Sequence, residues 1–123
     1  MDEILKEFVA EATGMVEQLG SALAAMPPGG DSELFESAYR AVHTVRGASG
    51  FLALEDLEAL TTRGELLLAR LRDGVLEPTA ERMDLLDRLH QELAVRLTAL
   101  DSGAPAPAPN QALLSDLATA ADA

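Results

Sequence analysis

Residues 31–50 read DSELFESAYRAVHTVRGASG, and the spacing of apolar residues in this stretch sets the fold class. Asp31 and Ser32 are both good helix N-caps, so a helix is expected to begin at one of them. Its apolar positions recur in steps of three and four residues and it fades around Gly50. Such a stripe indicates one buried face of an amphipathic helix, here formed by Leu34, Phe35, Ala38, Val42, Val45 and Ser49.

Three further long helices are predicted around this one. The first spans about residues 2–26 and ends at Pro27-Pro28-Gly29-Gly30, because proline cannot continue a helix. The next runs from about residue 54 to 73, with Gly74 as its stop, and the last opens near Pro78, a favoured first-turn residue. The stripe of the first helix comprises Ile4, Leu5, Phe8, Val9, Ala12, Met15, Val16, Leu19, Ala22, Leu23 and Met26. Four such helices with short loops predict an all-α, antiparallel four-helix bundle.

The remainder of the chain divides into a linker and a short helix. We expect residues 1–101 to form the bundle, and residues 102–109 to be an extended, semi-rigid linker of alternating alanine and proline. Residues 110–123 are predicted to form a short fifth helix through Leu113, Leu114 and Leu117. This helix either packs on the bundle or leads to further domains, and the sequence leaves both possibilities open.

Composition excludes several classes of function. The formal net charge of −12 argues against binding nucleic acid or an anionic membrane, both of which attract basic surfaces. With no cysteine and two histidines, neither a disulfide framework nor a transition-metal site is expected. The N-terminus is acidic and no apolar run approaches the length of a membrane span, so a cytoplasmic location is expected.

The face of the 31–50 helix opposite its apolar stripe carries an unusual group of residues. His43 lies mid-helix on this exposed face, with Arg46 and Gly47 one turn onward and Gly50 beyond them. Glycine inside a helix costs about 1 kcal/mol relative to alanine, and the stripe does not require it here. Small residues beside an exposed imidazole let a partner's surface approach, and Arg46 places a positive charge near any anion on the ring. We therefore expect a docking strip around His43, made of Tyr39, Arg40, Gly47 and Gly50.

Three members of this group also have an ordinary explanation. Exposed histidines are common on helices, Gly50 is able to end the helix, and Gly47 is able to permit close helix packing. The functional interpretation therefore depends on the whole cluster around His43 and not on any single residue.

Residues 43–52, HTVRGASGFL, resemble the H-[ST]-x-[KR]-G-x-x-G signature of histidine phosphotransfer (HPt) domains. The likeness is greatest to the N-terminal phosphotransfer domain of chemotaxis histidine kinases of the CheA type. The opening residues 1–12, the Ala41-Val42 pair and the segment Leu71–Gly74 contribute to it. The resemblance implies an HPt-like bundle.

The resemblance also implies roles for individual residues. His43 would carry the phosphoryl group on Nε2, and Glu65, at the position where the family has a glutamate, would accept a hydrogen bond from Nδ1. Arg46 stands where the family usually has lysine and would stabilise the phosphate. Thr62 stands where the family often has a second histidine; it is able to hydrogen-bond but not to carry charge. His90 continues the apolar seam of the fourth helix and is interpreted as a histidine at the edge of the core.

By this resemblance the chain is a phosphoryl carrier in a chemotaxis-type phosphorelay. A histidine kinase catalytic domain would phosphorylate His43, and an aspartate of a response-regulator receiver domain would accept the group. The sequence has no G-x-x-x-x-G-K-[ST] loop, so ATP and Mg²⁺ are expected to be supplied by the partner domains. Whether the chain is itself an enzyme is left open, although it resembles a fragment of a protein histidine kinase.

Two other hypotheses fit the composition. The chain is alternatively an acidic helical adaptor in which His43 is incidental, or a degenerate HPt domain that docks partners without transfer. Only Thr62 motivates the second of these.

Overall fold

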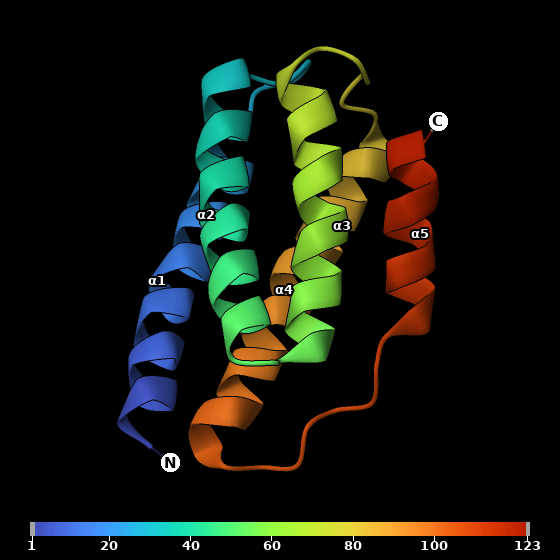
Figure 1. Ribbon diagram of the computed structural model, residues 1–123. Coiled ribbons are helices and arrows are strands. Elements are labelled where there is room, and N and C mark those ends of the chain that lie inside the picture. Colours follow the sequence, from blue (N-terminus) through green and yellow to red (C-terminus); the bar gives the residue numbers. More distant parts are fainter. Residues whose placement is uncertain (1, 123) are drawn as a thin grey trace.

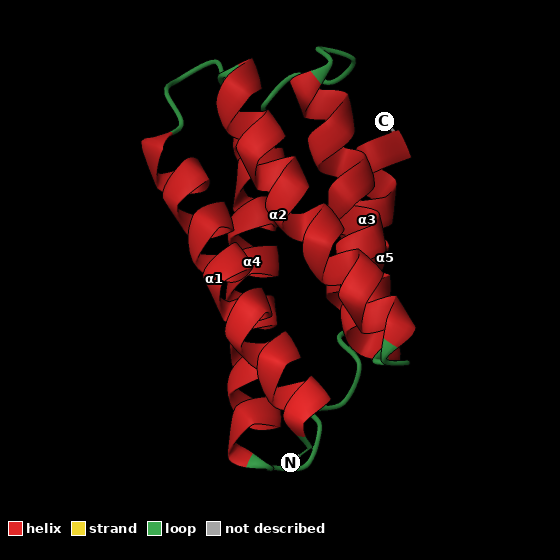
Figure 2. Ribbon diagram, turned by 60° about the vertical axis from the view of Figure 1, so that its left-hand side comes forward, coloured by secondary structure: helices red, strands yellow, loops and turns green. Residues whose placement is uncertain are grey.

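The computed structural model describes residues 2–122, and this part of the chain contains five helices and no strand (Figure 1). Figure 2 shows the same helices joined by short loops, except before the last one. The prediction of an all-α bundle is confirmed. The helices are α1 (Glu3–Ala25), α2 (Ser32–Phe51), α3 (Glu55–Arg72), α4 (Ala80–Ser102) and α5 (Gln111–Asp122).

Side-chain caps fix where four of the helices begin, the first three being α1, α2 and α4. The carboxylate of Asp2 accepts a hydrogen bond from the backbone N–H of Leu5 at 2.8 Å, and Asp31 does the same for Leu34 at 3.0 Å. Thr79 caps α4, so this helix begins at Ala80, two residues after the predicted opening near Pro78. Thr79, in the extended conformation of a cap, separates the proline from the first helical turn.

The connection between α2 and α3 is short and consists of residues 52–54. Within it Ala53 has φ of +57°, a left-handed conformation that non-glycine residues rarely adopt. The backbone N–H of Leu54 donates to the carbonyl of Ser49, which closes the turn. This tight turn makes α2 and α3 antiparallel neighbours.

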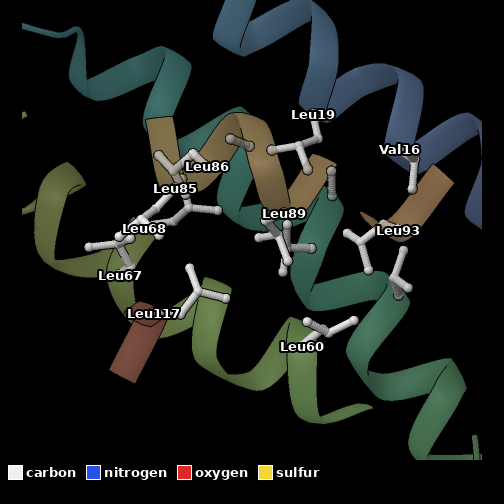
Figure 3. Packing of buried hydrophobic residues seen from close by; sticks show 14 of the residues in the cluster. Val16, Leu19, Leu60, Leu67, Leu68, Leu85, Leu86, Leu89, Leu93 and Leu117 are labelled. Atoms are coloured by element: carbon white, nitrogen blue, oxygen red, sulfur yellow. The ribbon is translucent and has the colours of Figure 1, made fainter. Parts of the chain in front are cut away.

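The core lies between the inner faces of the helices. α2 packs against both α1 and α3, and α4 packs against α1 and α3 from the other side. Ile4 does not join the stripe predicted for the first helix, since 61% of it is exposed beside the chain's start. Figure 3 shows leucines from α1, α3, α4 and α5 meeting in one cluster. Its most deeply buried members are Leu19, Leu60, Leu67, Leu68, Leu86, Leu89, Leu93, Leu113 and Leu117.

α5 packs against α3 and α4 rather than extending away from them. Its first turn is capped by Asn110, whose side-chain oxygen accepts from the N–H of Leu113 at 3.1 Å. Two arginines of α3 hold its backbone: Arg63 donates to the carbonyl of Leu114 at 2.9 Å, and Arg70 donates to the carbonyl of Ala121. The last turns of a helix have unpaired carbonyls, so Arg70 supplies a donor where one is needed.

The linker before α5 is held by a buried arginine. The side chain of Arg96 on α4 is only 4% exposed and pairs with Glu92 at 2.8 Å and Asp56 at 3.2 Å. Its remaining N–H groups donate to the carbonyls of Pro107 at 3.3 Å and Ala108 at 2.6 Å. One guanidinium therefore joins α3, α4 and the linker, which explains how a proline-rich segment keeps a fixed path.

No helix within residues 2–122 is both long and apolar enough to cross a membrane.

Replacing Arg96 with alanine is expected to detach the linker and loosen α5. The change removes the guanidinium donor of Asp56 and of two linker carbonyls and leaves Glu92 with only Asn110, so we expect the free energy of unfolding to fall by about 2–4 kcal/mol. Hydrogen exchange followed by mass spectrometry should show faster exchange in residues 104–122 and little change in α1 and α2.

Arg88→Ala is the matched control, because Arg88 also joins α4 to α5. Its partner is Asp116, at 3.4 Å, and both side chains are largely exposed. An exposed pair of this kind contributes at most about 1 kcal/mol. Equal effects of the two substitutions would contradict the role given to Arg96.

Candidate functional site

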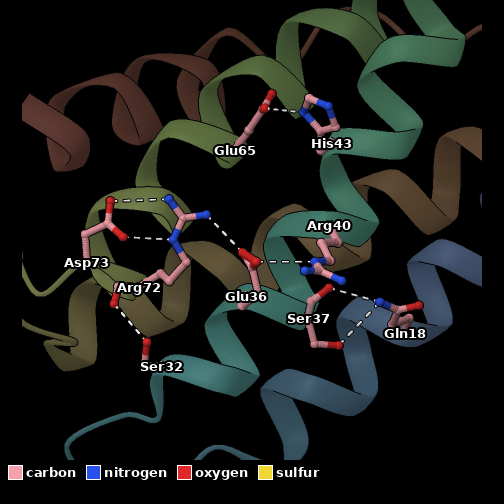
Figure 4. Close-up of polar contacts among 9 residues, drawn as sticks. All are labelled: Gln18, Ser32, Glu36, Ser37, Arg40, His43, Glu65, Arg72 and Asp73. Carbon is pink, nitrogen blue, oxygen red and sulfur yellow. Dashed lines mark hydrogen bonds and ion pairs between the residues drawn. The ribbon is translucent and has the colours of Figure 1, made fainter.

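The antiparallel pairing of α2 and α3 places His43 opposite Glu65 (Figure 4). Nδ1 of His43 lies 2.5 Å from Oε1 of Glu65. The histidine side chain is 50% exposed, whereas the glutamate side chain is 15% exposed. The carboxylate is thus set into the helix interface while the imidazole reaches out to solvent.

The neighbours of His43 determine its tautomer. A carboxylate only accepts hydrogen bonds, so the short contact requires a proton on Nδ1. Nη2 of Arg46 also lies 3.3 Å from this nitrogen, but a guanidinium only donates, and Nδ1 cannot accept while its proton faces Glu65. The shorter, charge-assisted contact prevails. No side chain within residues 2–122 hydrogen-bonds Nε2, so its lone pair is available to an incoming group.

Glu65 is held in its ionised form. Burial would raise the pKa of its carboxyl, but hydrogen bonding from His43 and Tyr39 and the positive charge of Arg46 outweigh burial and lower that pKa. A carboxylate that is ionised at neutral pH is able to accept a hydrogen bond from the Nδ1–H group of His43 and to stabilise positive charge on the ring.

Arg46 points toward Glu65 in this structure. Its Nε forms an ion pair with Oε2 of Glu65, and about a third of the side chain is exposed. This Nε is buried and its N–H is not aligned on an acceptor, so the contact is one of charge rather than a directed hydrogen bond. The stabilisation of phosphate by Arg46 stays a prediction, and it requires the guanidinium to be shared with Glu65 or to turn outward.

Tyr39 and Arg40 lie one turn before His43. The Tyr39 ring stacks on the His43 ring, with centroids 5.7 Å apart and planes 17° from parallel. Hydrogen bonding to Glu65, together with burial, raises the pKa of the Tyr39 hydroxyl. Arg40 is exposed and pairs with Glu36 at 3.2 Å, so it belongs to the same face without touching the histidine.

The two glycines of the motif differ in their surroundings. A Cβ at Gly47 would have no neighbour within 4 Å, so this glycine is not required for helix packing. Gly50 does not end the helix, since α2 continues to Phe51, and a Cβ there would meet the carboxylate of Glu58. Gly47 therefore leaves open space beside His43, as expected of a docking surface.

Thr62 and His90 lie outside the His43 contacts. Thr62 is exposed, and no hydrogen bond joins its side chain to His43 or Glu65 in the part of the chain that the structure describes. His90 is partly buried on α4, and its ring occupies the space left by the missing side chain of Gly20 on α1.

Two apolar residues near the site were not predicted. Phe51, at the end of α2, is 85% exposed, and Leu66, beside Glu65 on α3, is 43% exposed. The signal for Phe51 was present, because it falls outside the core stripe of its helix yet lies within the motif. Large exposed apolar side chains near a reactive group are typical of a surface that binds another protein.

Comparison with known proteins identifies the family of this chain. The profile of the Hpt domain family matches residues 3–103. The chain is 36% identical over 85 residues to a chemotaxis protein CheA of Halobacterium salinarum, covering 68% of this chain and 13% of that protein. It is 36% identical over 89 residues to the sensor histidine kinase CheAY of Helicobacter pylori, covering 72% of this chain and 11% of that protein. The chain thus spans only a small part of the length of these relatives.

A solved structure matches the whole fold. It is the phosphorylated P1 domain of CheA3 in complex with CheY6 from R. sphaeroides, which superposes with a TM-score of 0.86. The two sequences are 25% identical, and the match covers 99% of this chain and 98% of that one. A family profile that spans four of the five helices, together with this superposition, leads to one conclusion: the chain belongs to the Hpt domain family.

Proposed function

We propose that this chain carries a phosphoryl group on Nε2 of His43, between a histidine kinase catalytic domain and the receiver domain of a response regulator. The observation that carries the proposal is the contact of His43 Nδ1 with Glu65, which leaves Nε2 as an exposed nucleophile. The relatives support it, since one is named as a sensor histidine kinase and another is a phosphorylated domain in complex with CheY6.

The chemistry follows from the tautomer. The Nε2 lone pair attacks the γ-phosphorus of ATP held by the kinase domain, the Nε2–P bond forms, and ADP leaves. The ring then carries positive charge, which the Glu65 carboxylate stabilises through the Nδ1 proton. In the second step an aspartate oxygen of the receiver attacks phosphorus and the Nε2–P bond breaks, which restores the neutral imidazole. ATP and Mg²⁺ belong to the partner domains in this scheme.

The surface around His43 fits docking of a partner. Gly47 keeps the space beside the ring clear, and Tyr39, Arg40, Gly50 and Phe51 lie on or next to the same face of α2. The open strip lets the backbone of a partner helix approach, and the exposed phenyl group of Phe51 offers apolar area to bury. Arg46 lies close enough to the ring to turn toward a bound phosphoryl group.

The proposal extends to the organisation of the longer protein. We assign residues 1–101 as the phosphotransfer unit, 102–109 as a linker and 110–123 as a fifth helix packed on that unit, within a longer histidine kinase. Since ATP is the phosphate donor, the domain would work in the cytoplasm.

The rival hypotheses account for less. An acidic adaptor needs no carboxylate on Nδ1 of an exposed histidine, yet Glu65 is placed there. A degenerate HPt domain was motivated only by Thr62. Within residues 2–122 no hydrogen bond joins the Thr62 side chain to His43, and Nδ1 of His43 already has Glu65 as its partner.

His43→Gln should abolish phosphorylation while leaving the fold intact, because the nucleophile is removed from an exposed position. The measurement is incubation with a chemotaxis-type kinase catalytic fragment and labelled ATP, followed by acid and base treatment. Acid-labile, base-stable label is expected on the wild type. His90→Gln is the matched control, as it removes the other histidine and should keep the label. Label that persists in His43→Gln would contradict the assignment of His43 as the phosphorylated residue.

Glu65→Ala should slow phosphorylation without abolishing it, by about 10- to 100-fold, because the ring loses its orienting acceptor. Initial rates under the same conditions measure the effect. A rate equal to that of the wild type would show that Glu65 does not contribute to phosphorylation of His43.

Gly47→Ala separates docking from stability. Alanine at an exposed mid-helix glycine should raise the free energy of unfolding by about 0.5–1 kcal/mol. It should nevertheless weaken transfer to the receiver, because a methyl group enters the open space beside His43. Gly14→Ala on α1 is the control, since a Cβ there also meets nothing within 4 Å. It should stabilise the protein equally and leave transfer unchanged; equal transfer by both variants would argue against docking at Gly47.

A further inference from the structure

Tyr39 stands in contact with both residues of the His43–Glu65 pair. Its ring stacks on the imidazole at a centroid distance of 5.7 Å, and the planes are 17° from parallel. Its hydroxyl interacts with the Glu65 carboxylate, which raises the pKa of the phenol and helps to lower the pKa of Glu65. The residue is partly buried, so it is a poor candidate for a purely external docking contact.

Arg72 also contacts the ring of Tyr39. Its guanidinium carbon lies 4.6 Å from the centroid of the Tyr39 ring, within the range of a cation–π contact. Arg72 also pairs with Glu36 and with Asp73, both at 2.9 Å (Figure 4). Tyr39 is therefore in contact with the His43 imidazole and with a guanidinium that Glu36 and Asp73 hold in place.

The exposed imidazole needs such a restraint. A histidine ring rotates broadly about its Cβ–Cγ bond, and a half-exposed side chain has few neighbours to limit that rotation. The hydrogen bond from Nδ1 to Glu65 is made in only one ring orientation. A flat surface against the ring face favours that orientation without occupying either nitrogen.

We propose that Tyr39 is a positioning residue for His43: in contact with Arg72 and stacked on the imidazole, it holds the ring with Nδ1 on Glu65 and Nε2 toward the phosphoryl donor. The inference rests on the proposed phosphotransfer function and changes the role of Tyr39 from partner docking to preparation of the nucleophile. The stacked ring provides the main effect and the hydroxyl a smaller one.

A small phosphoryl donor tests this inference without any partner protein. Phosphoramidate transfers its phosphoryl group to histidine: the Nε2–P bond forms, the P–N bond of the reagent breaks, and ammonia leaves. Docking plays no part in this reaction, so a residue that serves only docking cannot alter its rate. The rate at His43, followed by ³¹P NMR and mass spectrometry, is compared with the rate at His90 in the same molecules.

We expect Tyr39→Leu to lower the rate at His43 by about tenfold, the size of effect that one aromatic contact supports. Tyr39→Met serves as a second variant without the ring, in case the first fails to fold. Tyr39→Phe keeps the stacked ring and should restore the rate to within about threefold of wild type. Modification of His90 should be unchanged in all of them, with unchanged circular dichroism.

Two results would overturn the inference. One is a wild-type rate at His43 in the variants that lack the Tyr39 ring, with slowing only when a kinase or receiver is used. This result would show that Tyr39 serves partner docking. A Tyr39→Phe rate as low as that of Tyr39→Leu would show that the ring contributes nothing. Failure of the proposed function is distinguishable from both, because the wild type would then react with phosphoramidate yet exchange no phosphoryl group with kinase or receiver.

Discussion

The contact between Nδ1 of His43 and the carboxylate of Glu65 is the interaction on which the rest of the site depends. It joins two helices across their interface, so its geometry is set by the bundle and not by either helix alone. The short turn at residues 52–54 makes α2 and α3 antiparallel neighbours. The buried leucines on the inner face of α3 then fix its rotation, so that Glu65 faces α2 at the edge of the core.

The same arrangement explains why an exposed histidine is chemically distinct. An isolated imidazole in water exchanges its proton freely between its two nitrogens. Here the carboxylate retains the proton on one nitrogen, Arg46 balances the charge of that carboxylate, and the stacked ring of Tyr39 limits rotation. In the proposed function, the scaffold prepares the nucleophile and leaves catalysis of transfer to the partner domains.

Much of the fold could be predicted because helical periodicity is strong in α1 to α4. The start of α4 could be predicted only to within two residues, because Pro78 and Thr79 both carry start signals and only backbone geometry shows which one caps the helix. The path of the linker could not be predicted, because it depends on Arg96 meeting groups far away in sequence. Arginine on a helix gives no sign of being buried until the surrounding packing is known.

Some features of the site could likewise be predicted from the sequence and others could not. His43 and Gly47 were identified from local pattern, and Glu65 only through resemblance to a family, because spacing alone does not fix which residue of α3 meets α2. The exposure of Phe51 could have been inferred from its place off the core stripe. The stacking of Tyr39 on His43 depends on side-chain conformation, as does the turn of Arg46 toward Glu65, and sequence periodicity does not report either.

The most direct test of the account is the tautomer of His43 in the unphosphorylated domain. Long-range ¹H–¹⁵N NMR of the imidazole, in samples at neutral pH, distinguishes the two ring nitrogens by their chemical shifts and couplings. We expect Nδ1 to carry the proton and Nε2 to lack one, and we expect Glu65→Gln but not Glu58→Gln to disturb this preference. A neutral ring protonated mainly on Nε2 in the wild type would contradict it.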